Sequence, residues 1–143
     1  MRIGMFESFV TRHWFSAEAK AIWSDAATLQ AWLDVEAALA DAQAELGVVP
    51  PQAAAVIRQH ARADAFDLEA LAEQIAFAQH PLVPVLHRFE VLCGEPAAGY
   101  LHWGATTQNI FDTACAVQMR RTHRLIVDEL QAAVQALAAL ALQ

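Results

Sequence analysis

The sequence predicts an all-α fold. Glycine and proline are scarce, at five residues each, and 57% of the 143 residues are apolar, many of them alanine. Such a composition favours helices. Helix start and stop signals also recur along the chain, and its length is sufficient for one domain with a hydrophobic core.

Two serines predict the first two helices. Ser16 is a suitable N-cap for a short helix over residues 17–23, and Ser24 for a longer one over 25–46. Gly47 follows as a C′ residue, the position at which helices commonly end in a left-handed conformation.

The next two helices also carry start signals. Pro51 can occupy the first position of a helix that runs to about residue 60, because its missing N–H has no intrahelical role there. Asp67 predicts the N-cap of a helix over 68–78, and apolar residues share one face of it by helical spacing.

A proline interrupts the pattern next. Pro81 disfavours helical backbone at His80, so we expect a break there. A fifth helix is predicted over 82–92 and ends at Gly94, and residues 95–99 are expected to form a loop.

The last helix is predicted to begin between Thr106 and Asn109 and to continue to the end of the sequence. Its second half carries an apolar seam at steps of three and four, typical of helices that pack against other long helices. Little in the first half of the chain can cover this seam. We therefore expect the helix to assemble with copies of itself, and the natural chain to continue. The seam consists of Ile126, Leu130, Ala133, Leu137 and Leu140.

Charge and composition exclude several classes of partner. The net charge is −7 and no basic stripe is present, which argues against nucleic acid. No apolar run reaches the roughly 18 residues of a membrane span, and no signal peptide is recognisable. Cys93 and Cys115 have no motif spacing, which predicts reduced thiols in a cytoplasmic protein.

Common cofactor and metal motifs are also missing. The sequence contains no G-x-S-x-G, P-loop or G-x-G-x-x-G, and none of the six histidines has metal-ligand spacing with cysteine or carboxylate residues. We therefore predict neither a cofactor nor a metal site.

The strongest polar constellation joins His102 to Thr106, Thr107, Gln108 and Asn109. Hydroxyls, an amide and unpaired first-turn N–H groups at a helix start can bind a carboxylate, which the helix dipole also favours. The alternative is purely structural, an N-cap box in which a threonine caps the helix and Asn109 lies in its first turn.

His80 is a second candidate. An imidazole held in a turn before proline could carry a proton or contact a substrate, because its ordinary pKa lies near neutrality. The alternative is a structural histidine at a helix end.

The motif over residues 102–114 reads H-W-G-A-T-T-Q-N-I-F-D-T-A, and further matches lie at residues 22–25, 29–40 and 46–50. In order and spacing these segments resemble the fumarase/aspartase superfamily, specifically its branch of 3-carboxy-cis,cis-muconate cycloisomerase and adenylosuccinate lyase. Members of that branch read close to H-W-G-A-T-S-Q-D-I-x-D-T-A in the motif.

The resemblance implies a fold and an assembly. The family is all-helical with three domains, and long helices of the middle domain form the core of a homotetramer. Residues 1–105 would then be the N-terminal helical domain, and 106–143 the first long helix of the central bundle, apparently truncated. That assignment accounts for the apolar seam.

The resemblance also implies a reaction on a polycarboxylate substrate, namely reversible β-elimination or lactone ring opening and closing. Thr106 and Thr107 match a Thr-Ser pair that the family places at a substrate carboxylate. Asn109 replaces the usual Asp, and His80 stands where adenylosuccinate lyases carry a histidine, but with Pro81 following as in the cycloisomerases. The Arg-Tyr pair that adenylosuccinate lyases place near their N-terminus for the nucleotide phosphate is not evident at residues 13–16. We therefore favour a cycloisomerase-like enzyme, with an adenylosuccinate lyase-like or other fumarate-releasing lyase as the alternative.

The family's serine loop, of the type G-S-S-x-M-P-x-K-x-N, and its second histidine motif do not occur in the sequence. Family active sites combine segments of three subunits, so this chain would supply one wall of a site and be inactive alone. A non-catalytic helical assembly module is the alternative from another functional class.

Overall fold

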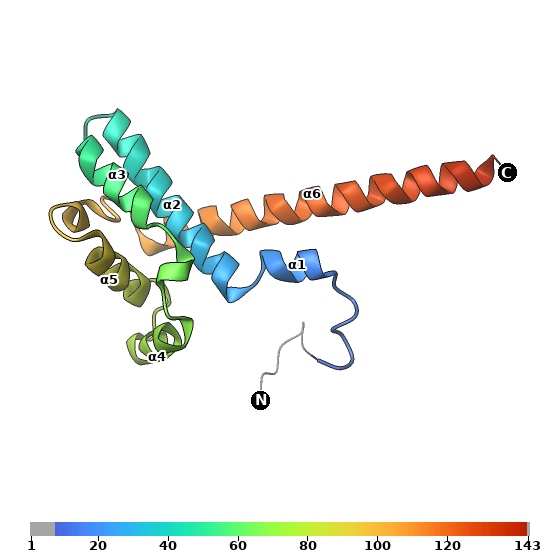
Figure 1. Ribbon diagram of the computed structural model, residues 1–143, viewed down its shortest axis with the longest axis horizontal. Helices are drawn as coiled ribbons and strands as arrows, with labels where there is room; N and C mark the ends of the chain where they lie inside the picture. Colours follow the sequence, from blue (N-terminus) through green and yellow to red (C-terminus); the bar gives the residue numbers. More distant parts are fainter. Residues whose placement is uncertain (1–7, 143) are drawn as a thin grey trace.

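The computed structural model describes residues 8–142, and all regular elements in that range are helical, as predicted (Figure 1). The first seven residues of the irregular N-terminal lead-in lie outside the described residues. In chain order the elements are α1 (Ala17–Ile22), α2 (Asp25–Glu45), α3 (Pro51–His60), the 3-10 helix η1 (Ala63–Ala65), α4 (Leu68–Ala78), α5 (Leu82–Cys93), the 3-10 helix η2 (Ala97–Tyr100) and α6 (Thr107–Ala141).

The predicted caps hold the helix starts. Ser16 Oγ accepts the N–H of Ala19 at 3.1 Å, and Ser24 Oγ accepts that of Ala27 at 3.2 Å. Asp67 Oδ1 accepts two N–H groups of the first turn of α4, at 3.0 and 3.2 Å. Each cap satisfies donors that have no partner within the helix, which is worth about 1 kcal/mol.

The loop predicted over residues 95–99 is wrong in part. Residues Ala97–Tyr100 form η2, and the N–H of Leu101 bonds the carbonyl of Ala98 at 3.1 Å. Ala97 is buried, so its segment is shielded from water, and i→i+3 bonds within the chain satisfy polar backbone groups there.

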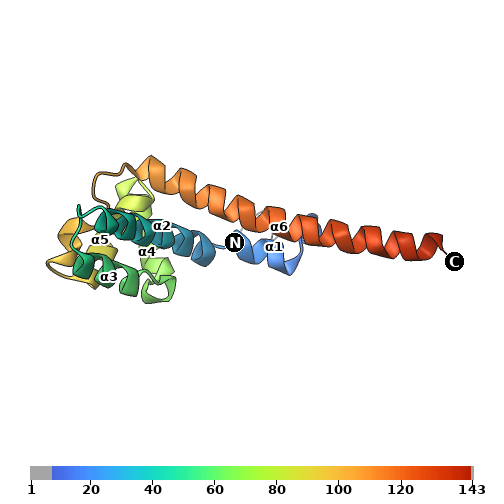
Figure 2. The ribbon, with the colours of Figure 1, turned by 90° about the horizontal axis from the view of Figure 1, so that it is seen from above.

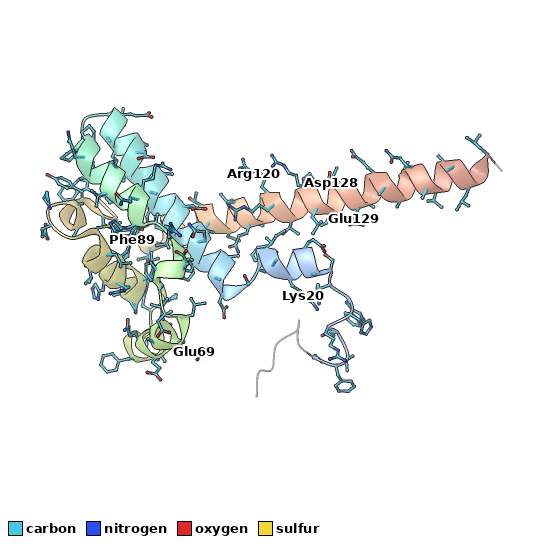
Figure 3. The ribbon with its side chains drawn as sticks, in the orientation of Figure 1. Lys20, Glu69, Phe89, Arg120, Asp128 and Glu129 are labelled. Atoms are coloured by element: carbon cyan, nitrogen blue, oxygen red, sulfur yellow. The ribbon has the colours of Figure 1, made fainter. Side chains whose placement is uncertain are left out.

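The core lies where α2, α3 and α5 meet, together with η2 and the start of α6. Phe89 of α5, labelled in Figure 3, is fully buried and contacts Phe66 edge-on, with ring centroids 6.4 Å apart. The other large, fully buried side chains are Leu33, Glu36, Val49, Ile57, Leu82, Val85 and Ile110.

Hydrogen bonds of two side chains, Gln118 and Trp23, attach α6 to the N-terminal helices. The buried Gln118 amide donates to the carbonyl of Ile22 at 2.8 Å and to Thr28 Oγ1 at 3.1 Å. Trp23 Nε1 donates to Thr122 Oγ1 at 2.9 Å. These contacts place α1 along the middle of α6, as both views show (Figure 1, Figure 2).

Beyond these contacts α6 extends away from the other helices (Figure 2). Its side chains there project without a neighbouring helix among the described residues (Figure 3). The predicted seam lies on this part and is exposed, with Leu130 and Leu137 at 60% and 65%. As expected, the rest of the described chain does not cover it.

Candidate functional site

A tight turn leads into α6. His102 and Gly104 both adopt positive φ, at 56° and 69°, and the N–H of Ala105 bonds the carbonyl of His102 at 3.3 Å. Glycine adopts this conformation freely, whereas a non-glycine residue does so only when its surroundings hold it there. The side chain of His102 therefore requires an anchor.

That anchor is Glu36, on the buried face of α2. His102 Nδ1 lies 2.6 Å from Glu36 Oε1, with the glutamate side chain 1% exposed and the histidine 19%. A second α2 side chain holds the same turn, because the Gln43 amide donates to the carbonyl of Trp103 at 2.7 Å. Two contacts from α2 thus determine where the turn, and with it the start of α6, is placed.

Sequence reasoning missed the role of Glu36, although a signal was available. Leu29, Leu33, Ala37 and Ala40 mark the buried face of α2, and Glu36 falls on that face by helical spacing. A carboxylate at such a position needs a buried partner. Asp34, which the sequence places on another face, is about half exposed.

Burial raises the pKa of Glu36 above its ordinary value of 4.5, and the contact with His102 offsets part of this shift. Only one of the two carboxylate oxygens has a partner among the described residues, since Oε2 is buried without one. The stability of the fold therefore depends on whether Glu36 is ionised.

This coupling predicts a pH dependence. The folded state keeps the Glu36 proton to a higher pH than the unfolded chain does, so the contribution of Glu36 to stability falls as the pH rises from about 4.5 through the raised pKa. Glu36→Gln should remove that decline. Urea unfolding of both proteins between pH 4 and 8 measures it, and parallel profiles would contradict the assignment.

His80 caps a helix with its ring. Its Nδ1 accepts the N–H groups of Leu82 and Val83, at 3.2 and 3.4 Å, at the start of α5. A ring nitrogen that accepts carries no proton, so in the neutral ring the proton is on Nε2. Nε2 lies 3.4 Å from Thr107 Oγ1, and the ring stacks on Phe111 with centroids 6.1 Å apart. His80 therefore caps the start of α5 and also contacts Thr107 of the predicted site.

The remaining predicted residues form the start of α6. Thr106 is the N-cap, and Asn109 Oδ1 accepts its N–H at 3.1 Å in the capping-box manner. Gln108 donates to Asp112 at 2.7 Å. An amide oxygen at Asn109 serves this purpose as a carboxylate would, which explains how the helix start tolerates Asn in place of Asp. Thr106, Gln108 and Asn109 are exposed and Thr107 is half-buried, so these side chains remain accessible at the surface.

An open groove of about 500 Å³ lies beside this helix start, between α2 and α6. Its lining is mostly small and apolar, which suits hydrophobic packing better than an anion. Asn109 contributes to it, but His80, Thr106 and Thr107 do not. The lining consists of Ala31, Asp34, Val35, Ala38, Leu39, Gly104, Ala105, Asn109, Ile110, Thr113 and Val117.

Other chemistries find less support in the described residues. No group of three or more histidine, cysteine or carboxylate side chains there could hold a metal ion. Burial raises the pKa of the Cys93 thiol to about 11, which makes it a poor nucleophile. None of the described helices is long and apolar enough to cross a membrane.

Comparison with known proteins identifies the family. No protein-family model matches the chain. Over 126 residues, however, it is 39% identical to N-acetyl-S-(2-succino)cysteine lyase of Enterococcus italicus, covering 88% of this chain and 28% of that protein. It is also 42% identical over 130 residues to 3-carboxy-cis,cis-muconate cycloisomerase of Pseudomonas aeruginosa, again covering 88% and 28%. The chain belongs to the fumarase/aspartase superfamily.

Solved structures of the superfamily share this fold. A fumarate lyase from Mesorhizobium sp. BNC1 superposes with a TM-score of 0.80 at 39% identity, covering 86% of this chain and 29% of that one. The matched part is the N-terminal portion of the superfamily proteins. The chain thus spans less than a third of the length of these relatives, and which superfamily reaction it serves is a matter for proposal.

Proposed function

We propose that this chain forms the carboxylate-binding wall of an enzyme that performs β-elimination or its reverse on a polycarboxylate, with a cycloisomerase-like reaction. The similarity to 3-carboxy-cis,cis-muconate cycloisomerase supports this reaction class. The observation that carries the site assignment is the contact of 3.4 Å between His80 Nε2 and Thr107 Oγ1.

The contact assigns the hydrogen-bonding roles of the Thr107 hydroxyl. Its oxygen accepts the proton on His80 Nε2, so its own proton is left for another acceptor. The hydroxyl stands in the first turn of α6, where free backbone N–H groups and the helix dipole also favour an anion. A substrate carboxylate supplies that acceptor. Abstraction of the neighbouring proton builds up further negative charge on it, which fixed donors stabilise.

In this proposal Thr106, Thr107, Gln108 and Asn109 surround the carboxylate. His80 contributes as a donor to Thr107, in place of the proton carrier expected from its sequence position. His102 lies at the turn before these residues and has one ring nitrogen without a partner among the described residues.

A fumarate-releasing lyase is the second candidate. The similarity to N-acetyl-S-(2-succino)cysteine lyase favours it, because a succino group carries the two carboxylates that such an elimination needs. A panel of carboxymuconate lactones and succinyl adducts, adenylosuccinate included, tested on the complete enzyme, separates the two candidates. Turnover of a lactone supports the first, and turnover of a succinyl adduct the second. Failure of every substrate would favour a non-catalytic assembly module.

We further propose that the apolar seam of α6 assembles subunits of the enzyme into a homotetramer, in which each site combines segments of several subunits. The seam is exposed among the described residues, and an isolated apolar stripe of this kind is stabilised when other long helices cover it. In that assembly this chain alone supplies part of the site and has no activity by itself.

Thr107→Val tests the proposed carboxylate-binding site at the start of α6. It removes the hydroxyl with little change in volume, and we expect kcat/KM of the enzyme to fall roughly 5- to 150-fold, or about 1 to 3 kcal/mol of transition-state stabilisation. Steady-state kinetics with the best substrate of the panel measures the change.

Thr113→Val is the matched control, because it makes the same replacement six residues further along α6, at an exposed position. We expect its kcat/KM to stay within about twofold of the parent. An unchanged kcat/KM in Thr107→Val would remove Thr107 from the site.

A further inference from the structure

In two histidines of the candidate site, Nδ1 has a partner of a different kind: hydrogen-bond donors at His80 and a carboxylate acceptor at His102. His80 Nδ1 accepts from backbone N–H groups, which leaves the proton on Nε2. His102 Nδ1 lies 2.6 Å from a carboxylate oxygen of Glu36. Two atoms this close form a hydrogen bond only if one of them carries a proton.

That proton belongs on the imidazole. An imidazole carries a single proton above its ordinary pKa of about 6.5, and beside an ionised carboxylate that proton lies on Nδ1, because the acceptor oxygen there needs a donor. Burial raises the pKa of Glu36, which favours the protonated carboxyl group. Even a protonated carboxyl can carry its proton on Oε2, which has no other partner among the described residues, and still accept from His102 with Oε1.

The second nitrogen of His102 is then a free acceptor. No described residue hydrogen-bonds Nε2, and the His102 side chain is 19% exposed. We propose that Glu36 is a positioning residue that holds His102 in its Nδ1–H form, and that Nε2 thereby becomes a hydrogen-bond acceptor at the turn that leads into α6.

The ligand must match both the donors at the start of α6 and the acceptor at His102 Nε2. A carboxylate satisfies the donors at the start of α6, and an acceptor at Nε2 needs an O–H or N–H group. The proposal therefore assigns a polycarboxylate that also carries such a donor. This ligand assignment rests on the proposed function, whereas the tautomer of His102 does not.

The tautomers can be measured directly in the 143-residue chain without ligand. Long-range proton–nitrogen NMR correlation of the ¹⁵N-labelled histidine rings at pH 8 distinguishes Nδ1–H from Nε2–H. The variants His80→Gln and His102→Gln assign the two rings, because each removes one set of signals. We expect Nδ1–H at His102 and Nε2–H at His80.

A second comparison tests Glu36 itself. Glu36→Met replaces the carboxylate with an apolar side chain of similar length, and we expect the Nδ1–H signature of His102 to be lost. Glu45→Met makes the same change at an exposed position of the same helix and should leave the signature intact. If Glu36→Met does not fold, as judged by circular dichroism, the tautomer of the parent chain still decides the question.

An Nε2–H proton on His102 in the parent chain, in a neutral or a doubly protonated ring, would overturn the proposal. So would an Nδ1–H signature that survives in folded Glu36→Met. Neither outcome depends on a substrate. Failure of this inference is therefore distinguishable from failure of the proposed carboxylate-binding site, which the kinetics of Thr107→Val tests separately.

Discussion

His102→Ala is expected to lower the free energy of unfolding at pH 7 by about 3 kcal/mol. The substitution leaves Glu36 buried without its partner, at 1% side-chain exposure, and a buried carboxyl group that loses its partner pays for its desolvation without compensation. Alanine also replaces a residue with φ of 56°, which adds backbone strain. Urea unfolding followed by circular dichroism measures the change.

Two variants separate the causes. His102→Asn tolerates the left-handed backbone but has a shorter side chain, so most of the loss should remain if the contact with Glu36 dominates. His123→Ala removes an exposed histidine from α6 and should change stability by less than about 0.5 kcal/mol. A loss below about 1 kcal/mol in His102→Ala would show that the pair contributes little to the fold.

Introducing charge into the seam of α6 is expected to have the second large effect. We expect the parent chain to self-associate, and the double variant Leu130→Asp, Leu137→Asp to weaken association at least about 100-fold, which corresponds to about 3 kcal/mol. The two leucines are more than half exposed and lie two helical turns apart on one face, so both carboxylates would have to be buried in any helical interface formed there. Sedimentation equilibrium over a range of protein concentrations measures the association.

The control adds the same charge to the opposite face. Gln131→Asp and Gln135→Asp lie one turn apart on the side of α6 away from the seam, and this double variant should associate more strongly than the seam variant. Equal losses in both variants would point to a general effect of charge. A monomeric parent chain at all concentrations would refute assembly through the seam.

Helix positions in this protein followed from the sequence because their signals are local. Ser24 caps α2, Pro51 begins α3, Asp67 caps α4 and Gly47 ends α2 with φ of 71°, and each acts within about one turn of its own position. The exposed seam followed for the same reason, since a helical period can be read along the chain.

The candidate site was predicted only as a set of residues. Thr106, Thr107 and Asn109 could be placed at a helix start from sequence, because capping is also local. Their assignment to a carboxylate stays a prediction, and so does the division of the chain at residue 105.

Tertiary structure decided the partners. Glu36 and His102 are 66 residues apart and His80 and Thr107 are 27 apart, and each pair meets only because the fold brings α2 and the turn before α5 to the start of α6. Those contacts determine which ring nitrogen carries a proton, and so whether a histidine donates or accepts. Residue type and spacing along the sequence carry no such information, because the tautomer of an imidazole depends on the atoms that surround it in the fold.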